Sequence, residues 1–438
     1  MKPRPIAYEC GRPINYSITV LVYGFAVPAC ACIAFAISPI AVMCYLLSLL
    51  TVINYRMSRD VLYPAFVFCA IWLIAATVYL LCPFEIDPLT WTTCAFFVFG
   101  ALCFSLGCIL GDRALITNRN RWFIQETTNS LPRRLLLIYS CLTLPLFVRD
   151  TIRLAGGFSF SPQFIISARD AIIATNISGE ARYSSMLVST APMVSILCAW
   201  LLLIEDKSRI LKGIAVTVVF IMCLLSTGRN MFLQFLIGWI VIVFLRAQDR
   251  SFAAMKKKGL VVLISVVALL SVLSLITKQA TQGDNALQVT GTMTVEYIAG
   301  PLAAFNFEMN HFSEMYQGDD QSKSFVRVPF PTNVFTFYQD YYTNWGASGC
   351  FLALLVVGFV HGRLFYTSIH GNRVAVLFMI YLYYALALSI FSDAYSLASR
   401  HVEVIGYAVF YFWVLRNIPR VSLHIELFKY DLRVNRPS

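Results

Sequence analysis

Residues 91–111 read WTTCAFFVFGALCFSLGCILG, an unbroken stretch without a charged side chain. An α-helix needs about 20 mainly apolar residues to cross the hydrocarbon core of a bilayer. This stretch has that length, and it lacks the alternation of apolar and polar residues that marks a half-buried strand. It therefore predicts a membrane-spanning helix, and comparable stretches recur along the chain.

The composition of the whole chain agrees with a membrane protein. Of its 438 residues, 58% are hydrophobic and 13% are charged, whereas soluble domains carry about 45–50% and about 25%. Mean hydropathy is +0.70. A soluble fold cannot bury this much apolar surface, because its exterior is in water. These values exclude a soluble enzyme, a disordered chain and a disulfide-linked scaffold.

The apolar runs predict an all-α, polytopic integral membrane protein with about 12 transmembrane helices. The runs lie at 16–36, 39–54, 61–83, 91–111, 135–153, 187–204, 213–227, 231–245, 259–277, 348–366, 374–393 and 402–415. The first run contains Ala29-Cys30-Ala31, which resembles a signal-peptide cleavage site. We interpret it as a retained helix, because a second apolar run follows at once.

The positive charges set the expected orientation. The net charge is +11, with 34 Lys and Arg against 23 Asp and Glu, and cytoplasmic loops of membrane proteins are enriched in Lys and Arg. If both termini are cytoplasmic, most of these cations fall on the cytoplasmic side, so they indicate topology and not a nucleic-acid surface. The chain is then one transmembrane domain, 1–438, with two long periplasmic loops at 156–185 and 278–347 and a basic cytoplasmic tail at 416–438.

The first long loop predicts a short helix with one apolar face, formed by Phe164, Ala168 and Ile172. Such a helix either lies on the membrane surface or packs on neighbouring helices, and both alternatives stay open.

The second long loop has three parts. Residues 279–294 are polar and turn-like, and Gly300-Pro301 predicts a break followed by a helix start, since Pro suits the first helical position. An aromatic stretch then precedes the next span, and its side chains are expected to form an interfacial belt, with sugar stacking as the alternative. These residues are Phe335, Phe337, Tyr338, Tyr341, Tyr342 and Trp345.

Polar residues at span ends are candidates for function. Arg229 lies in the very short connection between the runs 213–227 and 231–245. An Arg at membrane depth is costly and tends to be functional, although a side chain that reaches lipid phosphates is the alternative. Arg400 and His401 fall in the last predicted periplasmic turn, where His401 is either a packing residue or a base. Arg149-Asp150 is expected to form a local ion pair.

Other features have a structural interpretation. Gly107 and Gly111 permit close helix packing, and most of the Cys residues lie in apolar runs, where they behave as small hydrophobic residues. Among charged residues, Glu403 alone falls clearly inside a predicted span. The sequence contains no P-loop, GxGxxG, HExxH or GxSxG motif, so ATP-driven transport and nucleotide-sugar chemistry have no support.

This pattern resembles the bacterial O-antigen polymerases of the Wzy type. The resemblance is carried by the twelve-span layout, the hairpin Thr227-Gly228-Arg229, the segment from Tyr297 to Gly300-Pro301, and the stretch from Asp340 to Gly349 that leads into a span containing Gly358 and Gly362. It covers most of the chain in layout but few residues in identity.

The resemblance implies a membrane glycosyltransferase that polymerises undecaprenyl-pyrophosphate-linked oligosaccharide repeat units for lipopolysaccharide or a related surface polysaccharide, at the periplasmic face of a bacterial inner membrane. Its expected partners are this substrate, membrane lipids, a chain-length regulator and a flippase, with no nucleic acid. Because several Arg can hold a pyrophosphate bidentately, no metal and no other cofactor is expected. The implied pyrophosphate- and substrate-binding residues are Arg229, Arg169, Arg182, Arg327, Arg400 and Tyr297. The candidate bases are His401, Glu296 and His311.

Two alternatives use related substrates. An O-antigen ligase transfers the finished polymer to a different acceptor, and sequence barely separates it from a polymerase. A flippase for lipid-linked oligosaccharides predicts buried charges within spans and short outside loops. A non-catalytic membrane scaffold is the remaining alternative.

Overall fold

The computed structural model of the protein describes residues 38–82, 86–112, 131–159, 183–206, 208–226, 229–246, 286–315, 326–327, 331–332, 335–370, 372–392 and 394–395, with scattered positions between 164 and 175 and residue 406. The regular secondary structure of this part is helical except for a short antiparallel pair of strands, β1 (Val326–Arg327) and β2 (Pro331–Thr332). The helices are α3 (Pro39–Ser58), α4 (Pro64–Leu80), α5 (Trp91–Gly111), α6 (Leu131–Leu154), α8 (Met186–Glu205), α9 (Arg209–Leu225), α10 (Arg229–Leu245), α12 (Ala286–Met315), α13 (Phe337–Ile369) and α14 (Arg373–Ala387).

Five helices of the described part are long and apolar enough to cross a membrane: α3, α5, α6, α8 and α13. Helices α4, α10 and α14 are apolar but shorter. The prediction of an α-helical membrane protein is thereby confirmed, while the number of spans and the two loops stay predictions. The predicted runs 16–36, 259–277 and, apart from Gly406, 402–415 lie outside the described residues.

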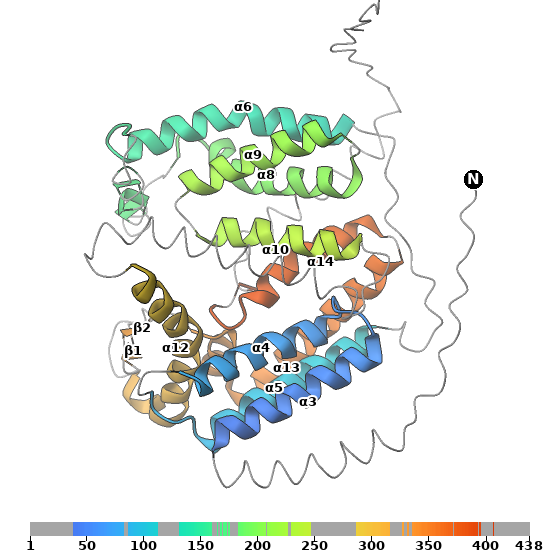
Figure 1. The fold of residues 1–438 in the computed structure, drawn as a ribbon, viewed down its shortest axis with the longest axis vertical. Coiled ribbons are helices and arrows are strands. Elements are labelled where there is room, and N and C mark those ends of the chain that lie inside the picture. The colour runs from blue at the N-terminus through green and yellow to red at the C-terminus, as the bar shows by residue number, and fades with distance from the viewer. Residues whose placement is uncertain are drawn as a thin grey trace, which may run out of the picture.

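The helices form two groups joined by a central pair (Figure 1). Helices α3, α4, α5 and α13 pack together in one group, and α6, α8 and α9 form the other. Between them, α10 packs on α8 and on α14, and α14 packs on α13. Helix α12 lies at one end of the bundle and packs on α4. This end is termed the α12 end.

The closest helix contact joins α5 to α13 through glycine. A methyl group added at Gly107 would overlap the carbonyl oxygen of Leu355, and one added at Gly358 would overlap that of Phe104. Gly111 and Gly362 make equivalent backbone contacts farther along the same pair. The contacts advance together along both helices, so the two run parallel. Small residues spaced by four allow such close approach in membranes, and the prediction made for Gly107 and Gly111 is confirmed.

Helix α13 reverses direction at Gly346. This residue has φ 66° and ψ −172°, a conformation that costs glycine little because it has no Cβ. In a straight helix, residues 338 and 350 would be about 18 Å apart. Instead, Sγ of Cys350 donates to the carbonyl oxygen of Tyr338 over 3.8 Å. A short arm, 337–345, therefore lies against a long arm, 347–369, and the two are termed the α13 hairpin.

The hairpin divides the aromatic residues that were expected to form an interfacial belt. The side chains of Phe335, Phe337 and Tyr338 are buried, whereas that of Trp345 is 60% exposed. Tyr338 contacts the rings of Trp72 and Phe97, with centroid distances of 4.8 and 5.1 Å. The belt prediction is therefore wrong for the start of this stretch, because the chain folds back into the core.

Helix α14 ends inside the bundle. Its 15 residues span about 22 Å, less than the roughly 30 Å of a hydrocarbon core. Leu388, Ser389 and Ile390, which follow it, are buried. The predicted run 374–393 is thus too long, because the helix stops at Ala387. The short arm of the α13 hairpin begins where α14 ends and continues in the same direction, so the two together form a broken span.

Two predictions for the loops are also settled. Helix α12 runs from Ala286 to Met315 with Pro301 inside it, so the predicted break at Gly300-Pro301 and the turn-like state of its first residues are wrong. Burial of the stretch 299–305 in the bundle offsets the backbone hydrogen bond that proline removes. In the first loop, Phe164, Ala168 and Ile172 are buried, which favours packing over a surface-lying helix.

Candidate functional site

The two pieces of the broken span meet end to end. The backbone N–H of Phe337, at the start of the short arm, donates to the carbonyl oxygen of Ser389 over 3.0 Å. Ser389 lies in the turn just after α14, so the negative end of one helix dipole faces the positive end of the next. Thr336 is the N-cap residue of the short arm, yet its side chain makes no capping hydrogen bond. This meeting point is termed the helix break.

Several buried polar atoms around the helix break lack partners. Within the described part of the chain, Oγ1 of Thr336, Oε1 of Gln339 and Oγ of Ser389 have no hydrogen-bond partner, although all three residues are at most 2% exposed. A buried polar group without a partner costs roughly 1–3 kcal/mol, and lipid offers no water to replace it. The helix break is therefore a costly arrangement, and such arrangements in membranes indicate function.

A buried carboxylate lies near the other end of the short arm. Glu308 of α12 is 0% exposed, and its Oε1 accepts a hydrogen bond from the hydroxyl of Thr343. Thr336, Gln339 and Thr343 follow the i, i+3, i+7 spacing of one helix face. The polar face of the short arm therefore continues from the helix break to Glu308.

Helix α12 is fixed at this place by an amide. Oδ1 of Asn306 accepts hydrogen bonds from the backbone N–H of Thr90 at 3.0 Å and from the hydroxyl of Thr93 at 2.7 Å. These groups belong to the first turn of α5, where backbone N–H groups lack partners within the helix. Asn306 thereby caps α5 and holds Glu308, which lies two residues farther along, in register with the short arm.

A histidine borders the helix break from the long arm. His361 is 1% exposed, and its Nε2 lies 2.9 Å from the hydroxyl of Tyr395. Its Nδ1 has no hydrogen-bond partner in the described part of the bundle. The ring of Tyr395 also contacts that of Phe337, with 5.8 Å between centroids. His361 is thus connected to the helix break through the side chain of Tyr395.

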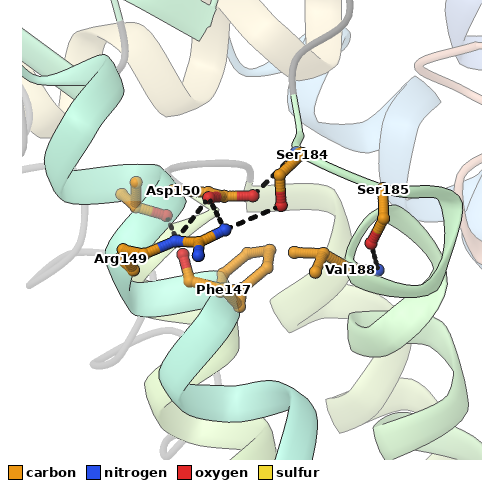
Figure 2. Close-up of polar contacts among 7 residues, drawn as sticks. Phe147, Arg149, Asp150, Ser184, Ser185 and Val188 are labelled. Carbon is orange, nitrogen blue, oxygen red and sulfur yellow. Dashed lines mark hydrogen bonds and ion pairs between the residues drawn. The ribbon is translucent and has the colours of Figure 1, made fainter.

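A second polar junction joins α6 to α8 (Figure 2). Asp150 is 0% exposed. Its Oδ2 accepts from the backbone N–H of Ser184 at 2.7 Å, and its Oδ1 accepts from the guanidinium of Arg149 at 2.9 Å. The same guanidinium donates to the hydroxyl of Ser184. The expected ion pair between Arg149 and Asp150 is confirmed, and it also closes the base of the first long loop.

Replacing Asp150 by alanine should lower the free energy of unfolding by about 1–3 kcal/mol, because the N–H of Ser184 loses its acceptor. Arg149→Ala should cost less, since the Arg149 side chain is 61% exposed and exposed ion pairs contribute little. Thermal unfolding of the purified protein in detergent measures both variants. Equal losses would show that the ion pair, and not the backbone contact, stabilises this junction.

The structure brings few of the predicted site residues together. Glu296 is half-buried and Tyr297 is 42% exposed, both on α12. Arg229 is the first residue of α10 and Arg327 lies in β1, but their side chains are outside the described part. Arg169, Arg182, Arg400 and His401 lie outside the described residues. The side chain of His311 is likewise undescribed.

Sequence reasoning missed Glu308, Thr336, Gln339, Ser389 and His361. For Glu308 a signal was present, because it lies three residues after Phe305 and four before Phe312, on the apolar face of α12. For the others the sequence carries no such signal.

The expectation that Glu403 stands alone among charges within spans is wrong. Arg133, Asp150 and Glu308 are all at most 1% exposed in the bundle. Arg133 lies 3.9 Å from Asp206 near the end of α8, so pairing offsets the cost of its burial.

Within the described residues there is no group of three or more His, Cys, Asp and Glu side chains that could hold a metal ion. Comparisons with known protein families, with curated proteins and with solved structures found no match.

Proposed function

We propose that the protein is a membrane glycosyltransferase that polymerises undecaprenyl-pyrophosphate-linked oligosaccharide repeat units at the periplasmic face of a bacterial inner membrane. The observation that carries the proposal is the complete burial of the Glu308 carboxylate. The long segment 278–347 supplies α12, and α12 brings a fully buried carboxylate to a hydroxyl at the α12 end. A plain connecting loop does not require a buried ionisable group, whereas a catalytic site does.

The proposed reaction needs a base and cations. The acceptor hydroxyl oxygen forms a bond with the anomeric carbon of the growing chain while the bond from that carbon to undecaprenyl pyrophosphate breaks. The hydroxyl proton passes to a base, and the pyrophosphate leaves with the electron pair of the broken bond. Glu308 joins His401 and Glu296 as a candidate base. Arginines stabilise the charge that develops on the leaving group, and the chain supplies Arg169, Arg182, Arg229, Arg327 and Arg400 on the proposed periplasmic side.

A flippase for lipid-linked oligosaccharides is the second candidate. The broken span favours it, because transporters place their binding sites at discontinuous helices near the middle of the membrane. Buried ionisable residues such as Glu308 and His361 also fit a transporter. The ligase alternative shares the chemistry of the polymerase and differs in its acceptor.

Lipopolysaccharide banding from a strain that lacks the protein tests these candidates. We expect a single repeat unit on the lipid A core, restored to a ladder by the wild-type gene. Lipid-linked polymer without core attachment would indicate a ligase, and loss of both would indicate a flippase. An unchanged ladder would contradict all three.

Arg229 is the proposed pyrophosphate ligand. Helix α9 ends at Leu225 and α10 begins at Arg229, so the residue combines a guanidinium with a helix N-terminus, where anions bind. Arg229→Ala should nearly abolish polymer, and Arg229→Lys should be impaired because it keeps the charge and loses the bidentate fork. Gel analysis at matched protein abundance measures chain length, and Arg209→Ala, at the opposite end of α9, serves as the control. Wild-type ladders from Arg229→Ala would leave this residue as a lipid anchor.

A further inference from the structure

The polar atoms of the helix break point to a ligand. Thr336, Gln339 and Ser389 each carry an oxygen that has no hydrogen-bond partner among the described residues, and all three are at least nine-tenths buried. They belong to two chain segments that meet through the backbone hydrogen bond from Phe337 to Ser389. Irregular backbone at membrane depth is tolerated where it is buried in protein or lines a water-filled cavity. The side chains that remain unsatisfied are therefore available to a bound molecule.

The chemistry of these side chains favours a neutral, hydroxyl-rich ligand. An amide oxygen only accepts hydrogen bonds, whereas the two hydroxyls both donate and accept. Sugar hydroxyls can satisfy all of them, because they also donate and accept. Thr336, Gln339 and Ser389 include no carboxylate that would balance the charge of a cation and no cationic group that would hold an anion.

Aromatic rings beside the helix break favour a sugar over an isolated water molecule as the ligand. Phe337 contacts Tyr341 and Tyr395, with ring centroids 5.3 and 5.8 Å apart. Rings of this kind provide apolar surface for the C–H face of a sugar, while a small number of placed polar groups fix its orientation. Water needs the polar groups but gains nothing from the rings.

We propose that the helix break binds a sugar of the lipid-linked oligosaccharide, with Thr336, Gln339 and Ser389 as its hydrogen-bonding residues. This inference rests on the proposed function for the identity of the ligand. It adds a site within the bundle to the arginines and bases considered above.

Two conservative variants test the site. Thr336→Val and Ser389→Ala remove the unpartnered hydroxyls with little change in shape. The ligand-free variants should unfold at the wild-type temperature or higher, because an unpaired group is lost. Polymer formation should fall about tenfold or more, the factor that corresponds to one lost hydrogen bond. Ser368→Ala is the matched control. The buried hydroxyl of Ser368 also has no partner among the residues that the structure describes, but it lies at the far end of the long arm.

Binding is measured directly on the full-length protein in detergent. The probe is the lipid-linked oligosaccharide fraction extracted from the host cells, and undecaprenyl phosphate, which carries no sugar, is the comparison. We expect the oligosaccharide to raise the unfolding temperature of the wild type and of Ser368→Ala, but not of Thr336→Val. Equal shifts with undecaprenyl phosphate would place recognition at the phosphate and overturn the inference.

Two further results would overturn the assignment of a sugar site to the helix break. Lower unfolding temperatures for ligand-free Thr336→Val and Ser389→Ala would indicate structural water and overturn the inference. Wild-type polymer from both variants would do the same. Failure of the proposed function appears separately, as an unchanged ladder in the strain that lacks the protein, and the binding assay still reports on the site in that case.

Discussion

Gly358→Leu should prevent the protein from accumulating in a folded state. A side chain at this position would overlap the backbone of Phe104, and a backbone atom cannot move aside as a flexible side chain can. The long arm of α13 would have to leave α5, and with it the hairpin and the helix break would lose their support. Overpacking in a core typically costs about 1–3 kcal/mol, and displacement of a whole helix pair exceeds that range. Size-exclusion chromatography of the solubilised protein should show aggregate or no product.

A matched control separates this effect from the loss of glycine itself. Apart from the nearby backbone of α9 itself, no described atom lies within 4 Å of the place where a Cβ of Gly213 would lie, so Gly213→Leu adds a side chain in open space. It should leave folding intact, and a helix interior even favours it. Gly107→Leu, on the α5 side of the same contact, should reproduce the defect. A monodisperse Gly358→Leu protein would contradict the packing of α5 on α13.

Glu308→Gln should reduce polymer formation by about 10²–10⁴-fold, the usual contribution of a general base. The amide keeps the size of the side chain and can still accept the hydrogen bond from Thr343, so folding should be retained. It cannot take up a proton. Glu308→Asp keeps the carboxylate and should retain part of the activity. Ladder length at matched protein abundance is the measurement.

A neighbouring substitution controls for general damage to α12. Asn310 lies on the same helix and is exposed, so Asn310→Gln should give normal ladders. Thr343→Val removes the hydroxyl that positions the carboxylate and should weaken activity less than Glu308→Gln. If Glu308→Gln polymerises normally, the carboxylate serves only to hold α12 on the short arm.

The membrane fold could be predicted because its signal is local. The uncharged stretch 91–111 needs no partner to be identified as a span, and Gly107 and Gly111 indicate close packing by their spacing alone. The reversal at Gly346 could not be predicted in this way. Residues 337–345 have the same aromatic composition whether they lie at the interface or in the core. What decides between these states is the contact with Ser389, a residue far along the chain.

The candidate site was less accessible to sequence reasoning for a related reason. Arginines in predicted loops are conspicuous, and most of those named lie outside the described side chains. Thr336, Gln339 and Ser389 are common residue types, and their importance comes from burial without hydrogen-bond partners among the described residues. Burial of this kind depends on tertiary structure. Glu308 is the exception, since a carboxylate between Phe305 and Phe312 on one helix face indicates a buried charge.

The broken span also constrains the order in which the protein can be assembled. The short arm begins at Phe337, but the carbonyl group that receives its first N–H belongs to Ser389, which the ribosome adds later. Until α14 has entered the bilayer, the first N–H of the short arm lacks its acceptor, and the polar residues of the short arm lack the turn after α14 against which they pack. Insertion of the chain through α14 must therefore finish before the α13 hairpin can reach its final position. A chain truncated before α14 would carry every described residue of α12 and α13 and still lack the helix break.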